Sequence, residues 1–350
     1  LNSADIKYTP TDGTVTLKKA IIRYTEENYN KLVAPENVIV SNGAKQSLSV
    51  LMQAIINPQD EVIILTPYWV SYPEMVKIAY GVPVIVTPED GGVHPRIKEI
   101  DENVGSYTKA IIVNSPCNPS GAMFSEEFIA GIVEYCEKKK IYLIMDDIYS
   151  QLIFDGRTRI SPYKYAKEDS DHSRLVVING VSKQYAMTGF RIGWTIANPQ
   201  VVEAMDNIQS QTTSCPSALL QAAAAGALTG IQSHIESLRL TLENNRNVLL
   251  QELNTLDGLR TYKPDGTFYC FPDFSAYNKD SRALSEFLLE KVLVVTVPGV
   301  EFGMEGHLRL SFCGTIKEIK EGVERIKWAL DPNAPNEIFI GDRKLVRDWL

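Results

Sequence analysis

The sequence predicts an α/β protein, with a large domain built on a mostly parallel sheet covered by helices and a smaller α+β domain after it. Short, almost wholly apolar runs alternate with segments of helical periodicity through the first two thirds of the chain, which is typical of parallel strands buried on both faces. After one long predicted helix this alternation changes. The 350 residues, 44% hydrophobic and 22% charged, are enough for two such domains.

Four segments of the first part have apolar residues at intervals of three and four, as on one face of a helix. In the last of these segments, Phe128, Ile129, Ile132, Val133 and Cys136 form the apolar stripe. The predicted helices cover residues 14–27, 45–56, 72–79 and 125–138.

Five apolar runs in the same part of the chain are too short for helices. The predicted strands are residues 62–65, 82–86, 110–113, 141–145 and 175–178. In an open parallel sheet the carboxyl ends of the strands collect at one edge, and ligands bind beyond that edge. The residues that follow these strands are therefore the first candidates for a functional site.

The C-terminal part begins with a long helix, predicted over residues 232–253. Its further predicted elements are strands at 266–271, 292–297 and 307–312 and helices at 281–291 and 315–330. We therefore divide the chain into a large domain, residues 1–238, and a small domain, residues 239–350. We expect the last twenty or so residues, 331–350, to pack as an extension of the small domain.

Charge and composition exclude several classes of protein. The net charge is −8 and no basic cluster is present, which argues against nucleic-acid binding. The longest apolar stretches, 219–228 and 292–297, are too short to span a membrane, and no signal peptide is expected. The five cysteines are widely spaced and the four histidines isolated, so we expect reduced thiols in a cytoplasmic protein without a metal site.

Polar residues follow three of the predicted strands. Asn118 comes after the strand at 110–113, Asp146 and Tyr149 after the strand at 141–145, and Lys183 with Arg191 after the strand at 175–178. We expect these side chains to meet at one edge of the sheet. Gly43 and Ala44 precede Lys45 at the start of a predicted helix, where free N–H groups and the helix dipole favour a phosphate.

This set of residues suits a covalent aldehyde cofactor that carries a phosphate, and pyridoxal 5′-phosphate meets the description. The Lys183 amine would condense with the aldehyde, and the planar fork of Arg191 would hold the phosphate. An acid such as Asp146 beside a pyridine nitrogen would keep that nitrogen protonated. Tyr149 and Asn118 could hydrogen-bond the phenolic oxygen of the ring.

Trp69 offers an aromatic face on which the ring could stack. Each of these residues also has an ordinary structural interpretation. Lys183 could be a solvated lysine in a loop, Asp146 a helix N-cap, Tyr149 and Trp69 core side chains, and Asn118 part of a turn. The joint pattern favours the cofactor site over these separate explanations.

At this point the chain resembles fold-type I pyridoxal-phosphate enzymes of the class I aminotransferases, and within them most closely the prokaryotic aspartate aminotransferase subgroup. The resemblance runs from about Tyr8 to Leu330. The motifs that carry it are Tyr8-Thr9-Pro10 with Gly13, Pro67-Tyr68-Trp69-Val70-Ser71-Tyr72-Pro73, Asn118-Pro119-Ser120-Gly121, Asp146 with Tyr149, Ser182-Lys183 with Arg191, and Arg309 in Leu308-Arg309-Leu310-Ser311.

The resemblance implies catalytic roles for Lys183, Asp146 and Tyr149, with Lys183 as the general base that moves a proton between the substrate and the cofactor. It implies an obligate homodimer in which Tyr8 reaches the phosphate in the partner's site. It also implies that Arg309 binds the substrate α-carboxylate. The substrates would be an amino acid and a 2-oxo acid in a ping-pong reaction, with aspartate and 2-oxoglutarate as the first choice.

Sequence pattern supports Arg309 independently. In residues 307–312, Leu308, Leu310 and Phe312 share one face of a strand and leave Arg309 on the other. The plain alternative is a solvated strand arginine.

Lys45 resembles the group that binds the distal carboxylate of the substrate in the aspartate-using subgroup. The plain alternative is an ordinary surface lysine at a helix start. A cation at a helix N-terminus is electrostatically disfavoured, which favours a functional reason for its presence.

The chain departs from the family pattern in a few places. Cys117 stands where asparagine is frequent, Ser120 where threonine is frequent, and Asp147 where glutamate is usual. Gly180 lacks the hydroxyl that some lineages place near the phosphate. Family members usually have several dozen residues upstream of the position of Leu1, including a glycine near the substrate carboxylate. Either that segment is missing from this sequence, which we expect, or the protein is atypical.

Other activities remain open. Aminotransferases for aromatic amino acids, alanine or prephenate, and lyases or synthases on the same fold, share these motifs. A nicotinamide-dependent dehydrogenase predicts a Gly-x-Gly-x-x-Gly turn after an early strand, and the sequence has none. A non-catalytic sensor on this fold would be expected to lose Lys183 or Asp146, and both are present.

Overall fold

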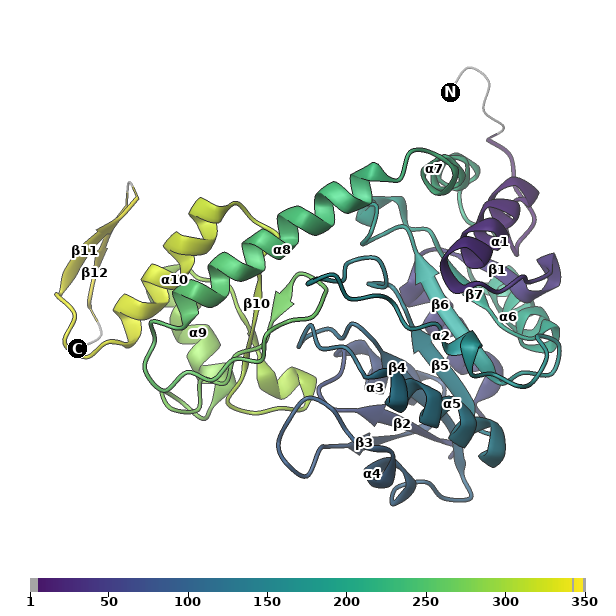
Figure 1. Ribbon diagram of the computed structural model, residues 1–350, viewed down its shortest axis with the longest axis horizontal. Helices are drawn as coiled ribbons and strands as arrows, with labels where there is room; N and C mark the ends of the chain where they lie inside the picture. The colour runs from purple at the N-terminus through teal and green to yellow at the C-terminus, as the bar shows by residue number, and fades with distance from the viewer. Residues whose placement is uncertain (1–5, 342, 349–350) are drawn as a thin grey trace.

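A seven-stranded sheet forms the centre of the computed structural model, which describes residues 6–341 and 343–348 (Figure 1). Its strand order is β1-β7-β6-β5-β4-β2-β3. The strands are β1 (Val38–Ser41), β2 (Glu61–Leu65), β3 (Val82–Val86), β4 (Thr108–Asn114), β5 (Tyr142–Asp146), β6 (Leu175–Gly180) and β7 (Gly193–Ile196). Only β7 runs antiparallel to its neighbours, so the predicted mostly parallel sheet is confirmed.

Helices cover both faces of this sheet, as Figure 1 shows. They are α1 (Val15–Tyr29), α2 (Ala44–Ile55), α3 (Ser71–Ile78), α4 (Ile97–Asp101), α5 (Glu126–Lys139), α6 (Pro199–Thr212) and α7 (Ala218–Thr229). One face packs against α1, α5 and α7, and the other against α2, α3 and α6. The strands are therefore buried on both sides, which explains why their sequences are apolar at consecutive positions.

Local signals account for where the helices begin and end. The Ser125 side chain accepts a hydrogen bond from the Phe128 N–H at the start of α5, and Lys140 ends that helix in the left-handed conformation. α1 begins after Thr14, which caps it in the same way. These caps satisfy N–H groups that have no partner inside the helix.

The C-terminal part packs around its own core (Figure 1). It contains α8 (Ser233–Leu253), β8 (Tyr269–Cys270), α9 (Ser281–Val292), β9 (Val297–Pro298), β10 (Leu308–Ser311), α10 (Ile316–Leu330), β11 (Glu337–Ile340) and β12 (Arg343–Val346). A three-stranded sheet of order β8-β10-β9 lies among the helices. The proposed domain boundary between residues 238 and 239 falls within α8, and that division stays a prediction.

Several element predictions need correction. The predicted strand at 292–297 is wrong over most of its length, because α9 continues to Val292 and Leu293 ends it in the left-handed conformation. The strand predicted at 266–271 is only two residues long. The elements β1, β7, α4, α6, α7, β11 and β12 were not predicted from the sequence. β11 and β12 pair antiparallel, and the buried Arg347 donates to the Trp328 and Asp331 carbonyls at the end of α10.

Within the described residues, no helix is long and apolar enough to cross a bilayer, and no three His, Cys, Asp or Glu side chains gather as a metal ion would require.

Candidate active site

Three neighbouring strands end at the same edge of the large sheet and carry the predicted polar residues. β4 ends at Asn114, β5 at Asp146 and β6 at Gly180, and the loops after them contribute the rest. A cavity of about 390 Å³ lies at this edge, between the sheet and β8 and β10 of the C-terminal part. Its lining includes nine predicted residues: Ala44, Lys45, Trp69, Asn118, Asp146, Tyr149, Lys183, Arg191 and Arg309.

Asp146 ends β5 and Asp147 follows it, and the two acids point to opposite faces of the sheet. Asp146 lines the cavity, whereas Asp147 accepts a hydrogen bond from the hydroxyl of Tyr29 at 2.9 Å on the other side. Both are buried. Burial raises the pKa of Asp146 to about 6, and hydrogen bonds from Tyr72 and the Ile148 N–H oppose this rise. Alternation along the strand therefore leaves only Asp146 available to a ligand.

Lys183 lies in the cavity with its ammonium near aromatic rings. Its Nζ is 5.2 Å from the centroid of the Phe268 ring and 5.8 Å from that of Tyr149. Burial lowers the pKa of Lys183, and the nearby Arg309 and Arg191 guanidinium groups lower it further. A lowered pKa raises the fraction of free amine, which is the form that attacks a carbonyl or accepts a proton.

Arg191 and the start of α2 form a cradle for an anion. Gly43 precedes α2 with a φ of 88° and supplies no side-chain cap to the first N–H groups of the helix. A Cβ on Gly43 would lie 2.4 Å from Nη2 of Arg191, so only glycine lets this guanidinium approach the loop. Arg191 also donates to the carbonyls of Thr188 and Asn42. The positive charge of Arg191 and the dipole of α2 therefore both favour an anion at the same position.

Arg309 enters the cavity from β10. Its Nη1 donates to the side-chain oxygen of Asn118 at 3.0 Å, and its guanidinium carbon lies 4.3 Å from the centroid of the Tyr269 ring. The neighbouring Leu308 and Leu310 are buried on the other face of the strand, as their alternation predicted. These contacts hold the planar guanidinium in one orientation, as the recognition of a carboxylate requires.

Lys45 lies in the first turn of α2 at the same cavity. Its Nζ is 4.9 Å from the centroid of the Trp69 ring. Lys45 is exposed and Trp69 is half-buried. The cavity therefore has two separate cations, Arg309 and Lys45, besides the group formed by Lys183 and Arg191.

Tyr8 is the one predicted site residue that lies away from this cavity in the single chain. It is 92% exposed and lines an open cleft with Lys7 and residues 217–219.

Tyr72, Asn114 and Tyr269 also line the cavity, although no role was predicted for them from the sequence. Tyr72 and Asn114 both hydrogen-bond Asp146, one to its carboxylate and one to its carbonyl. Tyr72 belongs to the aromatic motif around Trp69, and Asn114 directly follows the strand predicted at 110–113, so both positions carried a signal. No local sequence pattern could have identified Tyr269. Its contact with Arg309 joins two strands, β8 and β10, that are far apart in the sequence.

A lysine, a buried acid and an anion cradle at the carboxyl edge of such a sheet define an enzyme site, and sequence comparison identifies the family. The sequence model described as "Aminotransferase class I and II" matches residues 2–326, so the chain belongs to the class I and II aminotransferases. Members of this family use pyridoxal phosphate.

Individual relatives agree with this assignment. The aspartate aminotransferase of Bacillus subtilis is 37% identical over 93% of this chain and 84% of its own length. A probable aspartate/prephenate aminotransferase of Aquifex aeolicus is 36% identical over 95% of this chain and 85% of its own length. The structure of Thermus thermophilus aspartate aminotransferase with maleate superposes with a TM-score of 0.88 at 36% identity, covering 93% of this chain and 84% of that one.

Proposed function

We propose that this aminotransferase uses pyridoxal 5′-phosphate to move an amino group between aspartate and 2-oxoglutarate in a ping-pong reaction. The observation that carries the choice of substrate is the pair of separate cations, Arg309 and Lys45, at one cavity. A dicarboxylic amino acid has one carboxylate for each of them. The names of the Bacillus and Aquifex relatives agree with an acidic substrate.

The residues present fit the cofactor. The close approach of Arg191 to Gly43, which any side chain at that position would block, leaves a cationic cradle suited to a phosphate. Asp146 is a buried acid aimed into the same cavity, where a pyridinium nitrogen would give it a partner. Asn118 and Tyr149 could bind the phenolic oxygen, and Trp69 could stack on the ring. The bound cofactor supplies an electron sink for the carbanion formed at the substrate Cα.

The residues of the chain would then share the remaining work. Arg309 binds the α-carboxylate and thereby fixes the position of the Cα–H bond. The Lys183 amine takes the proton from Cα and returns it at the next stage, for which a lowered pKa is favourable. Asp146 keeps its negative charge next to the ring nitrogen throughout, which stabilises positive charge there.

Lys45→Ala tests the choice of substrate. We expect kcat/KM for aspartate and glutamate to fall about ten- to a hundredfold, since a charge-assisted hydrogen bond contributes about 1.5–3 kcal/mol. Alanine and aromatic donors lack the distal carboxylate and should change little. The measurement is a transamination panel with aspartate, glutamate, alanine and phenylalanine as donors, and with 2-oxoglutarate and prephenate as acceptors.

Lys77→Ala is the matched control for this panel, because Lys77 is an exposed lysine of α3 that pairs with Glu74. It should leave every rate unchanged. If Lys45→Ala leaves the ratio of aspartate to alanine kcat/KM at the wild-type value, the assignment to aspartate is wrong. Prephenate as the preferred acceptor would instead place the protein with the aspartate/prephenate type of relative.

We also propose that the enzyme is a homodimer in which Tyr8 serves the partner's site. Tyr8 and Ile6 are 92% and 72% exposed in one chain, on a segment far from its own Arg191 cradle in sequence. Subunits with Tyr8→Phe mixed with subunits with Lys183→Ala should form heterodimers that hold one wild-type site. Transamination should then exceed the sum of the two separate variants and approach about a quarter of wild type at equal mixing. No recovery on mixing would show that Tyr8 acts within its own subunit.

A further inference from the structure

Tyr72 lies directly behind the buried acid of the site. Its hydroxyl donates to Oδ2 of Asp146 at 2.7 Å, and both side chains are buried. Tyr72 is in the first turn of α3, whereas Asp146 ends β5, so two separate elements meet at this bond. The Tyr72 ring also packs edge-on against Trp69, with 5.4 Å between the ring centroids.

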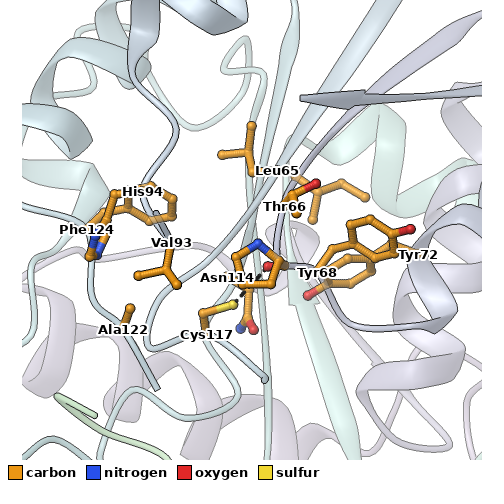
Figure 2. Close-up of a pocket in the computed structure, with 12 residues that line it drawn as sticks. Leu65, Thr66, Tyr68, Tyr72, Val93, His94, Asn114, Cys117, Ala122 and Phe124 are labelled. Atoms are coloured by element: carbon orange, nitrogen blue, oxygen red, sulfur yellow. Dashed lines mark hydrogen bonds between the residues drawn. The ribbon is translucent and has the colours of Figure 1, made fainter. Parts of the chain in front are cut away.

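The surroundings of Asp146 make the charge of its carboxylate dependent on the hydrogen bond from Tyr72. Tyr72 and Asn114 line both the active-site cavity and a second, small cavity of about 10 Å³ behind it. Figure 2 shows this second cavity, with Tyr68 and Tyr72 at one end and His94 and Phe124 at the other. Most of its other lining is apolar. Asp146 is itself only 4% exposed, so water contributes little to stabilising its charge, and that stabilisation has to come from fixed donors.

Asn114 fixes the backbone at the same place. Its side-chain amide donates to the carbonyl of Asp146 at 2.7 Å, and its side-chain oxygen accepts from the Asn118 N–H at 2.8 Å. Asn114 therefore orients the main chain of Asp146, while the carboxylate itself is oriented by Tyr72.

The groups that face the Asp146 carboxylate come from several elements. Besides Tyr72, the Ile148 N–H donates to Oδ1 at 3.4 Å and the Lys183 ammonium attracts the charge. Asp147 is the next acid along the chain, and its own pKa is raised mainly by burial and also by the Asp146 charge. Among these groups Tyr72 provides the short hydrogen bond, and its donation lowers the pKa of Asp146 against the effect of burial. Removal of the hydroxyl should therefore make Asp146 easier to protonate.

We propose that Tyr72 is a positioning residue that keeps the Asp146 carboxylate charged and aimed at the pyridine nitrogen of the cofactor. The inference rests on the proposed function, since it assumes that pyridoxal phosphate binds in this cavity.

The test is the affinity of the 350-residue chain, freed of cofactor, for pyridoxal 5′-phosphate, measured by absorbance titration from pH 6 to pH 8.5. For Tyr72→Phe we expect the dissociation constant to rise about tenfold at pH 8.5, since a hydrogen bond to a charged group is lost. The ratio of variant to wild-type dissociation constants should grow as the pH falls towards 6, because Asp146 becomes protonated at a higher pH in the variant. Protonation of the cofactor phosphate affects both proteins equally and cancels in the ratio.

Tyr29→Phe is the matched control. It removes the same kind of bond, from a buried tyrosine to the adjacent Asp147, outside the cavity. It should lower thermal stability and leave the affinity for pyridoxal phosphate and its pH dependence unchanged. A second control places Tyr72→Phe in an Asp146→Asn background, where the additional effect of Tyr72→Phe on affinity should largely disappear.

These controls separate the possible outcomes. A ratio that stays constant with pH, or an equal loss of affinity in the Asp146→Asn background, would show that Tyr72 only packs in the core and would overturn the inference. If the wild-type chain fails to bind pyridoxal phosphate, the proposed function itself is wrong, and the inference about Tyr72 is overturned with it.

Discussion

Lys183→Ala is expected to abolish transamination, with a fall in kcat of roughly 10⁴-fold or more, because one side chain supplies both the covalent link and the general base. Lys183 lines the same cavity as Asp146 and Arg309, and its lowered pKa increases the fraction of free amine that both roles need. The variant should still bind pyridoxal phosphate without a covalent bond, because Arg191, the start of α2 and Asp146 remain.

Borohydride reduction followed by peptide mapping measures this directly. In the wild-type protein the reduced label should be on Lys183, and in Lys183→Ala no lysine should be labelled. The exposed Lys164, which pairs with Glu126, gives a control variant whose labelling and turnover should match those of wild type. A label on another lysine of the wild-type protein would show that the site has been assigned to the wrong residue.

Asp146→Ala should reduce kcat by about 10²- to 10⁴-fold, because the ring nitrogen loses the charge that keeps it protonated. The same change should weaken cofactor binding, which a titration with pyridoxal phosphate would show. Asp147→Asn is the control, since Asp147 points away from the cavity and accepts from Tyr29. It should keep kcat within a few-fold of wild type. Equal losses in the two variants would contradict the alternation on which the assignment rests.

Asp147→Asn should instead change how stability depends on pH. Burial raises the pKa of Asp147 to about 7, and the Tyr29 hydrogen bond and the Arg159 guanidinium oppose this rise. The folded state therefore binds a proton that the unfolded chain releases near pH 4, so this group destabilises the fold progressively from about pH 4 to pH 7. The free energy of unfolding of Asp147→Asn should rise relative to wild type over that interval, as denaturant titrations at pH 4.5 and pH 7.5 would show.

Much of the site could be predicted from local sequence, because local sequence determines which elements form and which way their side chains face. Three of the apolar runs, at 110–113, 141–145 and 175–178, predicted buried parallel strands. Ligands bind at the carboxyl edge of such a sheet, so Asn118, Asp146 and Lys183, which follow these strands, were expected to lie close together. Alternation in 307–312 placed Arg309 opposite Leu308 and Leu310, as the structure has it. These inferences hold because a strand has a period of two and parallel connections return to the same edge.

Packing between distant elements decided the rest. The bond from Tyr72 to Asp146 joins residues 74 positions apart, and the contact of Arg309 with Tyr269 joins two antiparallel strands. β7 was not predicted because it has only four residues and directly follows the loop that contains Arg191, so no α-helix separates it from that loop. An apolar run such as 292–297 is compatible with a strand or with the end of a helix. That choice depends on which neighbouring surfaces bury its side chains, and only the tertiary structure determines those surfaces.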